Sequence, residues 1–204
     1  MSAYENFIRD FPTRCCEILD KHENDARSRG REVTLMLAMA TSGLVVPFER
    51  LRPRTEKTPY HDRINYTQAV SQFDSLLEEN FLGSQLWKSD VGSWSFGELR
   101  NVTGDPDAWK ELQDPLSPLG HYKKVNTILK HLRNALTHGN IFTRGRLDIK
   151  LIIFLSQPDP AILRFNFLCV SPQDFRRFLK NWFVFIKELK LPAEVLSSSI
   201  KDAA

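Results

Sequence analysis

The sequence predicts a mostly α-helical single domain with a β-hairpin placed before its last helix. Apolar residues recur at helical spacing through most of the chain, whereas β-rich runs stand out at residues 147–155 and 162–170. The chain has 204 residues, of which 42% are hydrophobic and 26% are charged, so it can bury a sizeable core. We place one domain at residues 1–192 and expect a flexible tail at residues 193–204.

Three helices are expected in the first part of the chain. Helical spacing of apolar residues over 3–28 predicts the first helix, in which Pro12 marks a kink or a break. Residues 31–51 are apolar nearly all round, which predicts a central, buried helix. A charged loop with two prolines then leads to a third helix over residues 64–82.

The segment 83–120 is the least regular part of the sequence. It is rich in glycine and proline and contains three tryptophans, Trp87, Trp94 and Trp109. Because exposed tryptophans are costly, we expect irregular structure whose tryptophans pack in the core rather than stack on bases.

The last part of the chain is expected to alternate helix and strand. An amphipathic helix should run from about residue 121 to residue 138, followed by the hairpin over residues 147–170. Ser171 is a suitable N-cap and Pro172 a suitable first residue for the final helix, which should reach about residue 190.

Composition also restricts location and cofactors. The N-terminus lacks the basic-then-apolar pattern of a signal peptide, and the apolar stretch 35–48 is interrupted by polar residues. The chain has three cysteines, no Cys-x-x-Cys pair and no histidines at zinc-binding spacing from them. We therefore expect a cytoplasmic protein without a membrane span, and neither a metal nor a cofactor.

Positive charge is concentrated around the amphipathic helix. Between Asp114 and Asp148 there is no carboxylate, but there are six lysines and arginines and three histidines. The formal charge of the whole chain is only +3, so the remainder is slightly acidic. A local field of this sign indicates an anionic partner, above all a phosphodiester backbone.

The end of this helix gathers the residues that could act on a phosphate. On a helical wheel the apolar residues form one stripe, and Arg133, Asn134, Thr137 and His138 fall on the opposite face. A helix C-terminus favours a protonated imidazole, which suits His138 as a general acid, and an arginine can hold a phosphate bidentately. The simpler interpretation is that these side chains only complement the helix dipole and are otherwise solvated.

The run Leu132-Arg133-Asn134-Ala135-Leu136-Thr137-His138-Gly139 resembles the signature of the HEPN superfamily, an Arg followed after four to six residues by a His. The late position of this signature at the end of a core helix is also similar to that superfamily. The hairpin and final helix resemble a bacterial HEPN subgroup found on plasmids and prophages. The toxin subgroup partnered by a nucleotidyltransferase carries a Tyr just before the His, where this chain has Thr137.

The resemblance implies a metal-independent endoribonuclease that dimerises to bring two motifs into one cleft. Arg133 would position and neutralise the scissile phosphate, His138 would be the general acid or base, and Asn134 would orient either the phosphate or the histidine. The 2′-hydroxyl of the RNA would attack, leaving a 2′,3′-cyclic phosphate. The implied role is bacterial defence or toxin-like growth restriction, with which an antitoxin or other regulatory partner would be compatible.

Other residues are candidates for contacts with RNA. Lys130, Arg144 and Arg146 could bind flanking phosphates, and His131, on the same exposed face of the helix as His138, could line the cleft. The acidic residues of the first two helices could support the site, but nothing in the sequence selects one. Two alternatives remain open: a non-catalytic HEPN module that binds RNA, a nucleotide or a protein, and a helical interaction or immunity-type protein whose basic helix docks on an acidic partner.

Overall fold

The computed structural model describes residues 4, 6–52, 66–100, 102, 104–112, 116–145, 148–157 and 164–191. Its helices are α1 (Phe7–Ser28), α2 (Glu32–Gly43), α3 (Val45–Leu51), α5 (Thr67–Glu78), α6 (Val125–His138) and α7 (Pro172–Glu188). Its strands are β1 (Ser95–Leu99), β2 (Ile141–Arg144), β3 (Leu151–Ser156) and β4 (Phe165–Val170). The mostly α class is therefore confirmed, whereas the tail at 193–204 lies outside the described residues.

Local sequence signals explain the ends of α1 and α7. The Asn6 side chain accepts a hydrogen bond from the Arg9 amide, so it caps α1, and the helix continues through Pro12 without a break. At α7 the hydroxyl of Ser171 accepts from the Asp174 amide at 3.2 Å, and Pro172 is the first helical residue. The predicted start of the final helix is confirmed.

The predicted helix over residues 31–51 is interrupted at Leu44, which separates α2 from α3. Pro47 explains the break, because it has no N–H to donate to the carbonyl of Gly43 four residues earlier. That carbonyl instead accepts a hydrogen bond of 2.9 Å from the indole N–H of Trp182 on α7. The acceptor that proline leaves unpaired thus joins α2 to α7.

The two β-rich runs pair antiparallel as β3 and β4, but they form the centre of a larger sheet. Its strand order is β1-β4-β3-β2, and all neighbours are antiparallel. The sequence did not predict β1, which comes from the segment 83–120, or β2, which directly follows the amphipathic helix. Short strands of four and five residues gave too little alternation to be recognised.

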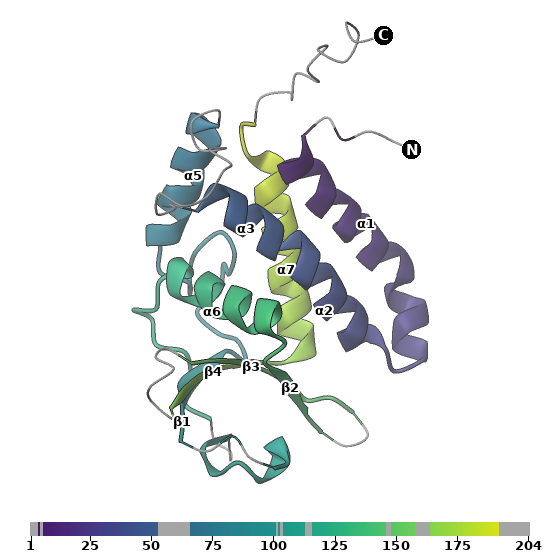
Figure 1. The fold of residues 1–204 in the computed structure, drawn as a ribbon, viewed down its shortest axis with the longest axis vertical. Coiled ribbons are helices and arrows are strands. Elements are labelled where there is room, and N and C mark those ends of the chain that lie inside the picture. Colours follow the sequence, from purple (N-terminus) through teal and green to yellow (C-terminus); the bar gives the residue numbers. More distant parts are fainter. Residues whose placement is uncertain are drawn as a thin grey trace, which may run out of the picture.

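The sheet has a buried layer on each face. Ile152, Phe154, Leu168 and Val170 belong to the main core, which includes all the α-helices. Alternate residues of the same strands, Ile153, Leu155, Phe167 and Cys169, belong to a smaller core with Trp109 and Leu112. Figure 1 shows α6 lying over one face of the sheet and the helical bundle beyond it. Trp87 and Trp94 lie in the main core, so the predicted burial of the tryptophans is confirmed.

The stretch Glu32–Leu51 has 20 residues with a mean hydropathy of 1.3, which is long and apolar enough to cross a membrane by length and composition alone. The absence of a membrane span therefore stays a prediction. In the structure, α2 and α3 pack against α1, α6 and α7, and core helices of soluble proteins pass the same test.

Candidate functional site

The C-terminal end of α6 is the candidate site, and its amphipathic pattern determines which side chains reach the surface. The buried stripe contains Val125, Ile128, Leu129, Leu132, Ala135 and Leu136. These residues fix α6 between the sheet and helices α2, α3 and α5. Arg133 and Asn134 are consequently half-buried, while Thr137 and His138 are exposed in the last turn.

Gly139 ends the helix directly after His138. It has the left-handed conformation (φ 68°, ψ 17°), and its amide donates to the carbonyl of Ala135. A Cβ at this position would meet no atom within 4 Å, so the only obstacle to a side chain is backbone strain. We expect Gly139→Ala to lower the free energy of unfolding by roughly 1–2 kcal/mol, measured by urea titration. Gly139→Asn should lower the free energy of unfolding by less, because asparagine tolerates the left-handed conformation. An equal decrease in both variants would contradict the explanation by backbone strain.

The guanidinium of Arg133 makes one ion pair and one hydrogen bond with neighbouring side chains. Its Nε lies 2.5 Å from Oε1 of Glu49 on α3, and its Nη1 donates to Oδ1 of Asn134 at 2.7 Å. Only 19% of the Arg133 side chain is exposed. The prediction that Asn134 orients the histidine or the phosphate stays a prediction; what it contacts is the arginine.

Glu49 is the acidic residue that the sequence could not select. Its second carboxylate oxygen pairs with Nη2 of Arg52 at 2.9 Å, one helical turn later. One carboxylate therefore pairs with two guanidiniums. The expectation of a carboxylate-free surround for Arg133 is wrong, because α3 brings Glu49 from a distant part of the chain. The only local signal was the Glu49–Arg52 spacing, which is common on helix surfaces.

His138 and Lys130 are both exposed on α6. No hydrogen bond or ion pair joins His138 to any other residue that the structure describes, so its imidazole can reach a ligand. Together, Arg133 and His138 offer an oriented cation and a proton donor at one helix end.

His131 lies in the interior, so its predicted place on the exposed face is wrong. Only 5% of it is exposed, and its ring nitrogens lie 2.8 Å from the carbonyl of Phe154 and 2.9 Å from the hydroxyl of Ser156. Both partners belong to β3. A helical wheel misplaced this residue because the sheet covers a wider part of α6 than the apolar stripe. His131 ties the site helix to the sheet through both of its ring nitrogens.

Burial lowers the pKa of His131, and nearby Lys123 lowers it further, against the opposing effect of the hydrogen bond to Phe154. When the pH falls below about 6.5, the imidazole of His131 therefore becomes protonated in the unfolded chain but stays neutral in the folded chain. The contribution of His131 to the free energy of unfolding should therefore be complete above about pH 6.5. It should decrease as the pH falls from there towards the lower pKa of the folded state.

We expect His131→Gln to flatten the pH dependence of the free energy of unfolding between about pH 7 and pH 5. At pH 7 this variant should be less stable by roughly 1–3 kcal/mol, because it cannot keep both hydrogen bonds. Urea titrations at several pH values measure both effects. The exposed His22, changed to glutamine, is the control, and an unchanged pH slope in His131→Gln would contradict the assignment.

The other predicted phosphate contacts are distributed differently. Arg144 is half-buried at the end of β2, where it donates to the carbonyl of Leu112 and lies 3.5 Å from Asp107. Arg144 therefore contacts residues beside the smaller core, and its guanidinium already has an acceptor and a carboxylate close by. Arg146 lies outside the described residues. Among the residues that are described, no group of three or more His, Cys, Asp or Glu side chains could hold a metal ion.

A mostly helical domain with an Arg and a His near the end of a core helix is the arrangement that the resemblance to the HEPN superfamily implied. Comparison with protein families matches the model of the family HEPN pEK499 p136 over residues 1–192. The chain therefore belongs to this plasmid-associated family of the HEPN superfamily. Searches of curated proteins and of solved structures returned no match.

Proposed function

We propose that this protein is a metal-independent endoribonuclease whose active site is the C-terminal end of α6. The observation that carries the proposal is the arrangement of Arg133, oriented by Glu49 and Asn134, in the same two helical turns as the exposed His138. Membership of a HEPN family makes a nuclease or an RNA-binding module the expected class.

In the proposed reaction, Arg133 neutralises the scissile phosphate and stabilises the charge that develops on its oxygens. The 2′-hydroxyl of the RNA loses its proton to a base and forms a bond to phosphorus. The bond from phosphorus to the 5′-oxygen breaks, and His138 as imidazolium protonates that leaving oxygen. The products are a 2′,3′-cyclic phosphate and a free 5′-hydroxyl.

This reaction needs a base as well as an acid, and one motif supplies one histidine. A homodimer would solve this, because a second copy of His138 could accept the proton of the 2′-hydroxyl. The exposed face of α6, with Thr127, Lys130, Thr137 and His138, is the surface that such a dimer would bring together. We include the dimer, a cytoplasmic location and a regulatory or antitoxin-like partner in the proposal, with a role in bacterial defence or growth restriction.

The test is to incubate the purified protein with a mixed RNA pool in excess EDTA and to identify the ends of any products. The proposal expects cleavage that EDTA does not inhibit, with 2′,3′-cyclic phosphate and 5′-hydroxyl ends. Cleavage that requires added divalent metal, or 3′-hydroxyl ends, would contradict the mechanism.

A non-catalytic RNA-binding module is the second candidate, and the contact between Arg133 and Glu49 favours it. An arginine whose Nε already faces a carboxylate at 2.5 Å has fewer donors left for a transition state. RNA binding without cleavage, weakened by salt and by loss of Lys130, would support this candidate.

A further inference from the structure

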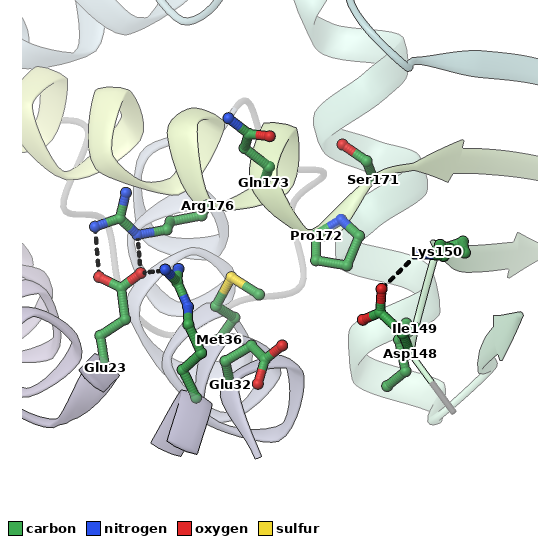
Figure 2. Close-up of a pocket in the computed structure, with 11 residues that line it drawn as sticks. Glu23, Glu32, Met36, Asp148, Ile149, Lys150, Ser171, Pro172, Gln173 and Arg176 are labelled. Carbon is green, nitrogen blue, oxygen red and sulfur yellow. Dashed lines mark hydrogen bonds and ion pairs between the residues drawn. The ribbon is translucent and has the colours of Figure 1, made fainter. Parts of the chain in front are cut away.

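A cavity of about 560 Å³ lies away from α6, and none of its lining residues belongs to that helix. Its walls come from α1, α2, the residues just before β3 and the first turns of α7. Figure 2 shows Glu23 and Arg176 on one side, Asp148 and Lys150 on the other, and Glu32 and Met36 between them. The volume is in the range of cavities that bind small molecules.

On one wall of the cavity, two guanidiniums pair with one buried carboxylate. The side chain of Glu23 is only 9% exposed, and it pairs with Nη2 of Arg27 at 2.9 Å and with both Nε and Nη2 of Arg176. Two guanidiniums share one carboxylate, so one positive charge is left over. Because 62% of the Arg27 side chain is exposed, that charge is accessible from the cavity.

Glu32 provides the opposite charge. Its Oε2 is buried and has no hydrogen-bond partner within the part of the chain that the structure describes. The ammonium of Lys150, which also lines the cavity, pairs with Asp148 at 2.5 Å. A buried carboxylate oxygen without a donor is unfavourable, and such a group indicates a missing partner.

We propose that this cavity binds a small zwitterion, an α-amino acid or a short peptide. The ligand's ammonium donates to Glu32, and its carboxylate pairs with the guanidinium of Arg27. Met36, Ile149 and Pro172 supply apolar surface for its carbon skeleton. The lining holds three carboxylates and three cations, so it favours a ligand that carries both an ammonium and a carboxylate. A polyanion such as RNA gains no net attraction there.

The experiment is calorimetric titration of the full-length protein with a panel of free amino acids, beside two half-ligands. An N-acetyl amino acid lacks the ammonium, and the corresponding alkylamine lacks the carboxylate. We expect saturable binding of at least one amino acid, with both half-ligands weaker by at least about tenfold. Glu32→Gln and Arg27→Gln should each weaken the zwitterion by a similar factor.

Matched controls are Asp25→Asn and Arg29→Gln, which remove an exposed ion pair of 3.0 Å on α1 that does not line the cavity. No saturable binding of any panel member at millimolar concentration would overturn the proposal. Equal binding of a half-ligand, or full binding by a folded Glu32→Gln variant, would also overturn it. None of these readouts involves RNA, so the result is independent of the nuclease proposal.

Discussion

RNA cleavage by the His138→Ala variant should be about 10²- to 10⁴-fold slower than by the wild type, because the 5′-oxygen then leaves without a proton donor. The fold should be unaffected, since His138 is exposed and contacts no other described residue through a hydrogen bond or ion pair. The measurement is the single-turnover rate of cleavage in EDTA. The control is His22→Ala, which removes an exposed histidine from α1.

Arg133→Ala should reduce the same rate by a comparable factor, but with a structural cost. Its removal breaks the ion pair with Glu49, so stability must be measured beside activity. Arg133→Lys separates the two effects, because lysine keeps the charge but cannot contact Glu49 and a phosphate with one planar fork. If both alanine variants cleave at the wild-type rate, the active site is not at the end of α6.

Replacement of Glu49, which contacts Arg133, should also slow cleavage strongly. We expect Glu49→Gln to slow cleavage by about 10- to 100-fold, because the guanidinium of Arg133 loses the carboxylate that orients its Nε. The loss should fall on kcat more than on KM, since the arginine remains present to bind the phosphate. The matched control is Glu17→Gln on the exposed face of α1.

A double variant distinguishes positioning from an unrelated defect. If Glu49 acts through Arg133, then adding Glu49→Gln to Arg133→Ala should cause little further loss of activity. Additive losses would show that Glu49 does something else. A Glu49→Gln enzyme that is faster than the wild type would mean that the carboxylate restrains the arginine, so that the phosphate must displace it.

The site helix was predictable because its information is local. Its apolar stripe has the period of a helix, and Gly139 marks its end, so the exposed position of His138 followed from the sequence. The N-cap of α7 is local in the same sense, since Ser171 and Asp174 lie within one turn. The break between α2 and α3 was not predicted, although Pro47 is a local signal for the end of a helix.

The surroundings of the motif could not be predicted, because they depend on which elements pack together. A sheet with two unrecognised strands covers the side of α6 that holds His131. This residue is therefore buried, although the helical wheel placed it on the polar face. The contact between α3 and α6 places Glu49 on Arg133, a pairing with no sequence signal. The sequence by itself determined the helical class, the motif and the end of its helix, because these follow from periodicity and capping. Only the tertiary structure decided which acid holds the arginine and which histidine is buried, because both depend on contacts between residues far apart in the chain.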